Sequence, residues 1–490
     1  MLMPQVDWPA LLPQFFLGGG GLVLLTLGSL LRRRLPAWFP AAFSAGAALG
    51  ALGGVIWLWI RVRDPARGAF TTIAETIGID GFSVFLSGVV AVSVLLAAVL
   101  AAGTLRREGL PAEEFCVLLL LSGAGGVTMA SANDLIVLFL GLEVLSIAAY
   151  VLAALDLRRS TAQEAGLKYF VLGAFASAFF LYGVALLYGA TGSTKLPLVA
   201  GFLAGGGPDS NALLLGGMAL LLVGLFFKVA AVPFHAWTPD VYEGAPPVAV
   251  AYMSAGVKAA GFAALLRVFN AALGANAADW QPIVYATAAL TVLAGAVLAA
   301  VQSDVRRLLA YSSISHAGFI LVGAEAATEA GVAGSLFYLG VYAFLALGSF
   351  AVVSIIGCGT DGRQSLDAYD GLAKRSPALA AAFTVLLLAQ AGVPFTTGFW
   401  AKLEVIGASV EARSYWLAAL AMLGAVVAAF LYLRILVRMY LTAPAQRSRP
   451  SISRSAGFVV AVCAAFTLVF GILPGPLVEL TNDATIHLGG

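Results

Sequence analysis

The chain has 490 residues, of which 61% are hydrophobic and only 11% are charged, and its mean hydropathy is +0.96. A soluble domain carries about 25% charged residues, so this chain has too few charges to cover a water-exposed surface. Disorder is excluded as well, because it requires low hydrophobicity and high charge. The net charge of +2, without a basic tail, argues against nucleic acid as a partner. The composition therefore predicts a polytopic membrane protein.

Fourteen apolar runs are long enough to cross a membrane, which takes about 20 mostly apolar residues. The runs are continuous and rich in Ala, Leu and Gly, unlike the alternating segments of a transmembrane β-barrel. The loops between them are short and leave no room for a soluble catalytic domain. The sequence therefore predicts an all-α fold. The spans begin near Leu11, Phe39, Ile79, Ala112, Asn133, Ala162, Ala212, Val248, Gln281, Val305, Gly331, Pro377, Tyr415 and Ala456.

Lysine and arginine residues are divided unevenly between the two sides of the predicted bundle. Fifteen of them fall in the loops after spans 1, 3, 5, 9, 11 and 13, and five fall on the opposite side. Because basic loops tend to stay in the cytoplasm, both termini are predicted to lie on the outer face. The loop between spans 2 and 3, with Arg61, Arg63 and Arg67, disagrees with this pattern. The fifteen are Arg32, Arg33, Arg34, Arg106, Arg107, Arg158, Arg159, Arg306, Arg307, Arg363, Lys374, Arg375, Arg447, Arg449 and Arg454.

Three lysines, Lys228, Lys258 and Lys402, interrupt apolar runs, whereas nearly every arginine lies in a loop or at a helix end. A charge at bilayer depth costs about 2.5–3.5 kcal/mol, so such residues usually face the protein interior and mark an ion pathway. A buried lysine can lose its proton, but an arginine cannot. The choice of lysine therefore favours a proton relay over a fixed counter-charge.

Glu143 lies near the middle of span 5, without a charged neighbour on its own helix. It therefore needs a partner from another span, and an interior lysine is the natural candidate. A buried Glu–Lys pair can be charged or neutral, depending on its geometry and on water access. Such a pair suits a switchable proton site, although a structural ion pair that fixes helix packing explains Glu143 alone equally well.

Two Val-Pro-Phe triplets interrupt spans 7 and 12, at Pro233 and Pro394. Proline removes a backbone donor and clashes with the preceding turn, so both helices are predicted to break there, near Lys228 and Lys402. The triplets lie 161 residues and five spans apart, which gives them opposite orientations in the membrane. Paired broken helices indicate inverted repeats with an ion site near the midplane.

Four further titratable residues are candidates for proton transfer. His316 lies in the middle of span 10, where it is either a relay residue or a buried neutral histidine bonded to a hydroxyl. Glu164 and Lys168 form a favourable i,i+4 pair at the inner end of span 6, and serve either the relay or only the helix end. His235 follows the break in span 7, where it lines a cytoplasmic path for protons or caps a helix.

The segments around these residues resemble subunit N, a family of antiporter-like membrane subunits of the bacterial NADH-quinone oxidoreductase, respiratory complex I. The resemblance covers spans 3 to 13 and is most specific in the stretch 237–246, Trp-Thr-Pro-Asp-Val-Tyr-Glu-Gly-Ala-Pro. It implies two inverted five-helix repeats, spans 4–8 and 9–13, and boundaries that divide the chain into 1–110, 111–275, 276–441 and 442–490. The other matching segments are 141–143, 164–170, 228–235, Lys258 and 306–316.

The resemblance implies a proton-translocating subunit that couples quinone reduction elsewhere in the complex to proton movement. Under this resemblance, Glu143 and Lys228 form the pair between spans 5 and 7. Lys258 is the residue that connects this pair to the rest of the relay. The resemblance also makes His316 a central relay residue and Lys402 the distal lysine. No cofactor or metal is expected in this chain, because NADH, FMN, iron–sulfur clusters and quinone belong to partner subunits.

The implied partners are the other membrane subunits of complex I, the lipid bilayer, protons and ordered water, in a bacterial inner membrane. Two other functions are compatible with the residues themselves. An Mrp-type cation/proton antiporter subunit would show the same fold and relay. A scaffold subunit would carry the same buried charges only to lock its helices together.

Overall fold

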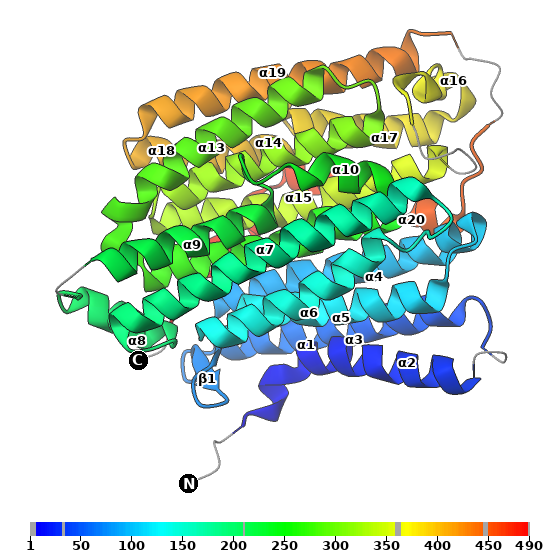
Figure 1. Ribbon diagram of the computed structural model, residues 1–490. Helices are drawn as coiled ribbons and strands as arrows, with labels where there is room; N and C mark the ends of the chain where they lie inside the picture. Colours follow the sequence, from blue (N-terminus) through cyan, green and yellow to red (C-terminus); the bar gives the residue numbers. More distant parts are fainter. Residues whose placement is uncertain (1–5, 32–34, 209–210, 358–363, 444–448, 489–490) are drawn as a thin grey trace.

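The structure is a computed structural model that describes residues 6–31, 35–208, 211–357, 364–443 and 449–488. The helices lie side by side in one bundle, and both chain termini lie at the same end of it (Figure 1). We call this end the termini end, and the end at which α16 (Leu372–Arg375) lies the opposite end. Arg32, Arg33, Arg34, Cys358, Arg363 and Arg447 lie outside the described residues.

Thirteen helices among the described residues are long and apolar enough to cross a membrane, so the predicted multi-pass helical fold is confirmed. The first is Trp8–Leu31, built from η1 (Trp8–Leu11), α1 (Leu12–Gln14), η2 (Phe15–Gly19) and α2 (Gly20–Leu31). Another, Pro247–Ala272, is built from α11 (Pro247–Tyr252), η3 (Met253–Val257), α12 (Lys258–Leu265) and η4 (Leu266–Ala272). The remaining eleven are α3 (Phe39–Val62), α4 (Gly81–Glu108), α5 (Ala112–Ser131), α6 (Leu135–Ala153), α7 (Ser160–Thr191), α9 (Ala212–Val229), α13 (Ala277–Ala300, preceded by η5, Gly274–Asn276), α14 (Val305–Glu325), α15 (Glu329–Ile356), α19 (Tyr415–Tyr440) and α20 (Arg454–Ile472).

The predicted span 12 is divided into two helices, α17 (Pro377–Ala391) and α18 (Thr397–Glu411). Neither half belongs to the thirteen, so a count of fourteen crossings requires the two halves to be taken as one span. That count stays a prediction. The other short helices are α8 (Leu196–Ala204), α10 (Trp237–Gly244), η6 (Leu366–Tyr369) and α21 (Gly475–Asn482).

A short antiparallel hairpin departs from the all-helical prediction. Its strands are β1 (Phe70–Thr72) and β2 (Ile77–Ile79), with Thr71 opposite Gly78. The hairpin lies in the loop between α3 and α4, at the termini end (Figure 1). All of β2 is buried, so this loop, whose charges disagree with the predicted orientation, packs against the bundle.

Both helices break at the Val-Pro-Phe triplets, as predicted. α9 ends at Val229, and the next residue, Ala230, has a positive φ of 63°. α17 ends at Ala391, and Gly392 follows with a φ of 89°, a conformation that glycine adopts without strain. The freed backbone needs partners inside the bundle. The N–H of Val232 finds one, because it donates to Thr291 Oγ1 at 2.9 Å.

Helices α6 and α14 begin in the same way but at opposite ends of the bundle. Asp134 accepts hydrogen bonds from the backbone N–H groups two and three residues later, and Asp304 does the same at the start of α14. Asn133, beside Asp134, contacts the C-terminal tail, whereas Asp304 bridges to Ser365, near α16. Two inverted repeats are expected to place the starts of equivalent helices at opposite ends of the bundle, as α6 and α14 do. The repeats and the four predicted boundaries remain predictions.

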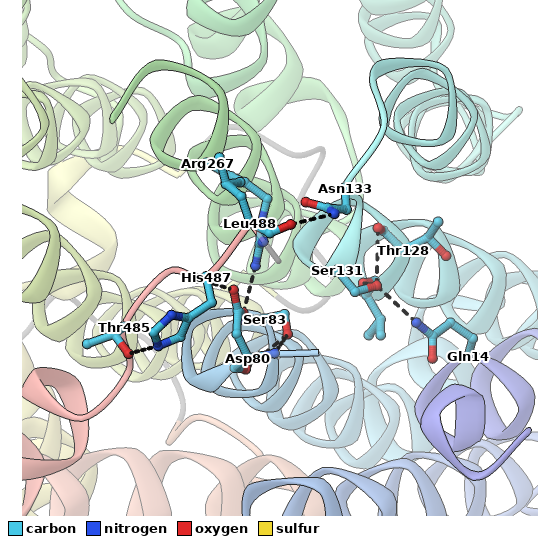
Figure 2. Close-up of polar contacts among 11 residues, drawn as sticks. Gln14, Asp80, Ser83, Thr128, Ser131, Asn133, Arg267, Thr485, His487 and Leu488 are labelled. Carbon is cyan, nitrogen blue, oxygen red and sulfur yellow. Dashed lines mark hydrogen bonds and ion pairs between the residues drawn. The ribbon is translucent and has the colours of Figure 1, made fainter. Parts of the chain in front are cut away.

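A buried ion pair fastens the C-terminal tail to the termini end (Figure 2). Arg267 of η4 donates to Asp80 Oδ1 at 2.7 Å, and the two side chains are 0% and 1% exposed. The second oxygen, Asp80 Oδ2, accepts from the backbone N–H of His487 at 2.8 Å. Asn133 Nδ2 donates to the carbonyl of Leu488 at 2.9 Å. The pair therefore joins α4, η4 and the tail.

Candidate functional site

The three interior lysines are all buried, Lys228 on α9, Lys258 on α12 and Lys402 on α18. Among the described residues, the lysines that form ion pairs are Lys168 and Lys195 alone. The three buried lysines instead donate hydrogen bonds to neutral oxygen atoms. A buried amino group is unfavourable without such hydrogen bonds, so each lysine occupies a polar site within the bundle.

Lys228 reaches from the last turn of α9 to α6, where its Nζ donates to Ser146 Oγ at 2.7 Å. Ser146 lies three residues after Glu143, which is half-buried near the middle of α6. Glu143 Oε1 is buried and has no hydrogen-bond partner among the described residues. The predicted Glu143–Lys228 pair is therefore not in direct contact in this structure. A cavity of about 10 Å³, room for about one water, lies beside Lys228, Ser146 and Tyr150.

Lys258 is the first residue of α12, directly after the π-helical turn η3. Its Nζ donates to the carbonyl of Ser313 at 2.6 Å and also to the Ser313 hydroxyl. The same Nζ lies 5.4 Å from the ring centre of Tyr342. One turn further along α12, a Cβ placed on Gly261 would lie 3.1 Å from Lys228 Cγ. Thus α12 contacts both the side chain of Lys228 and helix α14.

His316, in the middle of α14, is held between two tyrosines. Its Nδ1 lies 2.7 Å from the hydroxyl of Tyr338 on α15, and its Nε2 lies 3.0 Å from the hydroxyl of Tyr432 on α19. The Tyr432 hydroxyl also bonds to Ser312 Oγ at 2.5 Å. Each hydroxyl can donate or accept, so this chain of groups can pass a proton through the imidazole.

Lys402 faces the broken end of α17. Its Nζ donates to the carbonyls of Gln390 at 2.9 Å and Ala391 at 2.8 Å. These belong to the last helical carbonyls, which have no partner within their own helix. The negative end of the helix dipole also lies here and stabilises the ammonium group. The same Nζ lies 5.0 Å from the ring centre of Phe319 on α14.

One face of α14 connects these sites. Ser313, His316 and Phe319 are spaced three residues apart, so they lie on the same side of the helix. Ser313 contacts Lys258, and Phe319 contacts Lys402. The structure therefore brings Lys258, His316 and Lys402 together along one helix, with Lys228 next to Gly261 of α12.

Glu164 and Lys168 belong to an ion-pair network rather than to the row of interior lysines. Lys168 Nζ lies 2.7 Å from a carboxylate oxygen of Glu164 and 2.7 Å from one of Asp240. Arg307 pairs with Asp240 at 2.9 Å and with Glu243 at 2.7 Å. All five side chains are partly exposed, so each pair contributes about 0–1 kcal/mol. The network positions α7, α10 and α14 relative to one another.

The remaining predicted residues lie in the two breaks. His235 is half-buried between α9 and α10, and its Nδ1 has no hydrogen-bond partner among the described residues. Pro233 precedes it, and Pro394 lies between α17 and α18. No group of three or more His, Cys, Asp and Glu residues that could hold a metal ion occurs in the described part of the chain.

The sequence patterns did not single out the hydroxyl partners of the lysines and of His316. Ser146, Ser313, Tyr338 and Tyr432 lie in apolar helices where many other hydroxyl groups occur, so no single position stands out. Two of them carry a weak local signal, a position one turn from a titratable residue: Ser146 follows Glu143 by three residues and Ser313 precedes His316 by three residues.

Arg306, counted above as a loop charge, is in fact buried at the second position of α14. It donates to the carbonyl of Tyr242 at 3.0 Å and to that of Ala245, at the end of α10. It therefore links α14 to the broken region after α9. A charge count along the sequence cannot distinguish such a residue from a solvated arginine.

A protein-family model described as "NADH:quinone oxidoreductase/Mrp antiporter, TM" matches residues 132–428, more than half of the chain. NADH-quinone oxidoreductase subunit N of Salinispora arenicola is 40% identical, over 98% of this chain and 98% of that protein. Subunit N 1 of Solibacter usitatus is 39% identical, over 97% of both proteins. The chain belongs to the NADH-quinone oxidoreductase subunit N family. The family resemblance inferred from the sequence segments is thus confirmed.

Solved structures share the fold of this subunit N family member. A chain in the structure of respiratory complex I from Thermus thermophilus with bound aureothin has a TM-score of 0.81 and 32% identity, covering 95% of this chain and 98% of that one. A chain of the archaeal membrane-bound sulfane sulfur reductase has a TM-score of 0.85 and 28% identity, covering 96% of both. A chain of the Mrp complex from Dietzia sp., with a TM-score of 0.82 and 21% identity, shares the fold alone.

Proposed function

We propose that this chain is the antiporter-like, proton-translocating membrane subunit N of a respiratory complex I. One observation carries the proposal: Lys228, Lys258, His316 and Lys402 form a buried row whose polar partners lie on neighbouring helices. Its partners are the other complex I subunits, which hold NADH, FMN, the iron–sulfur clusters and quinone. The complex lies in a bacterial inner membrane, with the termini end of this subunit facing outward.

The cycle begins when a proton from the cytoplasm loads Lys228 or Lys258. In the arrangement seen here, Ser146 holds the Lys228 ammonium group and Glu143 Oε1 lies without a partner among the described residues. Movement of the Glu143 carboxylate toward Lys228 would stabilise the charged lysine. A neighbouring subunit that changes this coupling by about 1–3 kcal/mol alters the proton affinity of the lysine several-fold or more.

From Lys258 the proton moves along α14. Ser313 leads from Lys258 to His316, whose tyrosine partners can supply and accept protons. Ordered water completes the path to Lys402, where the carbonyl groups at the end of α17 stabilise the arriving charge. The proton then leaves toward the termini end.

The experiment that tests this function uses Lys228→Ala in inverted membrane vesicles that contain the whole complex. We expect NADH-driven proton uptake to fall several-fold, because the variant lacks a titratable group early in the path. NADH oxidation with an artificial acceptor should stay unchanged, because the redox centres lie on other subunits. Lys374→Ala is the matched control, since Lys374 is exposed on α16.

The outcomes distinguish the three functions considered from the sequence. Loss of both proton uptake and acceptor oxidation in Lys228→Ala would identify the lysine as a scaffold residue. Full proton uptake would contradict the relay. A salt-dependent pH gradient in vesicles that contain this subunit alone would favour an Mrp-type antiporter.

A further inference from the structure

We propose that Glu325 is the residue that receives protons from the distal lysine and releases them toward the termini end. This inference rests on the proposed function. Glu325 is the last residue of α14 and is 5% exposed. It belongs to none of the ion pairs formed by the described residues. Along α14 it is the next titratable residue after His316 in the outward direction.

The two carboxyl oxygens of Glu325 have different surroundings. Ser414, at the start of α19, donates its hydroxyl to Oε1 at 2.9 Å. Oε2 is buried and has no hydrogen-bond partner among the described residues. A buried carboxylate oxygen without a donor is unfavourable, so Oε2 is stabilised by binding a proton or a water molecule. One oxygen is therefore held in place, while the other is available for proton transfer.

Helix α18 runs beside α14 from Lys402 toward Glu325. Lys402 Nζ lies over Phe319, and one turn later Val405 packs at Gly323, where a Cβ would lie 3.0 Å from Val405 Cγ1. Glu325 is two residues beyond Gly323. With a rise of about 1.5 Å per residue, Phe319 and Glu325 lie about 9 Å apart along the helix axis. A few ordered water molecules span such a distance.

Polar groups line this outward segment. Ser335 lies three residues from Tyr338 on α15, and a Cβ on Gly323 would overlap its hydroxyl. The Ser335 hydroxyl donates to the carbonyl of Gly331 at 2.7 Å. At the far end, Ser409 on α18 donates to the carbonyl of Ser414 at 3.3 Å. Glu329, at the start of α15, is exposed, so the end of α14 that carries Glu325 lies close to the surface.

The decisive variant is Glu325→Gln in the assembled complex. Glutamine keeps the length of the side chain and can still bond to Ser414, but it cannot release a proton. We expect proton uptake by inverted vesicles, per NADH oxidised, to fall at least twofold, with acceptor oxidation and subunit content unchanged. Glu325→Asp should retain most of the uptake, and Glu329→Gln, four residues away on the surface, should retain all of it.

A spectroscopic measurement separates proton transfer from a structural role. Redox-induced infrared difference spectra of the complex should contain a carboxyl C=O band that is lost in Glu325→Gln and kept in Glu329→Gln. If Glu325→Gln does not assemble, Ser414→Ala replaces it, because the carboxyl group stays while its hydrogen bond is removed. A shifted carboxyl band then supports the inference, and an unshifted band overturns it.

The failure of this inference can be distinguished from failure of the proposed function. Wild-type uptake in Glu325→Gln, together with reduced uptake in Lys228→Ala, overturns the role of Glu325 and leaves the relay intact. If Glu404→Gln reduces proton uptake and Glu325→Gln does not, protons are released at Glu404, the half-buried acid of α18. Full uptake in both Lys228→Ala and Glu325→Gln overturns the proposed function as well.

Discussion

Replacing Asp80 with alanine is expected to destabilise the subunit by about 3–5 kcal/mol, because the buried guanidinium of Arg267 would keep its charge without a counter-ion. Asp80 is the only ion-pair partner of Arg267 among the described residues. The same substitution removes the acceptor of the His487 N–H, so the C-terminal tail should detach from the bundle. The measurement is the amount of subunit in the purified complex and its midpoint temperature of thermal inactivation.

Two variants serve as controls for this prediction. Asp483→Ala breaks the neighbouring Arg63–Asp483 pair, whose side chains are 53% and 41% exposed, and should cost about 0–1 kcal/mol. The double variant Asp80→Leu with Arg267→Met removes both buried charges and should recover the stability lost through the unpaired guanidinium, although the tail still lacks its acceptor. If Asp80→Ala behaves like Asp483→Ala, the buried pair does not fasten the tail.

Gly398→Ala is expected to abolish the contribution of Lys402 to proton uptake and to destabilise the subunit by about 1–3 kcal/mol. Gly398 lies in the first turn of α18, and a Cβ at this position would overlap the carbonyl oxygen of Ala389, a backbone atom. The two halves of the broken span must then move apart. Lys402, one turn later, would lose its contacts with the carbonyls of Gln390 and Ala391.

Gly407→Ala on the same helix is the matched control, because nothing lies within 4 Å of a Cβ placed there. Alanine favours a helix interior over glycine by about 1 kcal/mol, so this variant should be slightly more stable than the parent. Proton uptake and thermal inactivation, measured side by side for both variants, check the prediction. Equal uptake in the two variants would show that Lys402 does not need the end of α17.

The interior lysines and the two helix breaks could be predicted from the sequence, because each is a local signal. Lys228 and Lys402 stand out against apolar neighbours, and Pro233 and Pro394 cannot continue a helix. The hairpin at 70–79 could not be predicted in this way, because strands of three residues carry no recognisable period.

The partners of the titratable residues could not be predicted, because helix packing brings them together from distant parts of the chain. Ser146 lies 82 residues from Lys228, and Tyr432 lies 116 residues from His316. Glu143 and Ser146 both lie on α6, and the spacing of residues does not reveal which of them meets Lys228. The buried position of Glu325 depends in the same way on Ser414, 89 residues later.

The neutral oxygen partners of the three lysines have a consequence for the electrical balance of the membrane interior. A lysine held by a carboxylate leaves an isolated anion behind when it gives up its proton, and such an anion is costly in a medium of low dielectric constant. In the arrangement described here, the lysines are held by Ser146, Ser313 and the carbonyl groups of α17, and these neutral groups leave no anion behind. The lysines then interact mainly through mutual repulsion whenever two of them are charged. In the proposed relay, each arriving positive charge would favour the departure of the one ahead of it, so that protons would advance in single file.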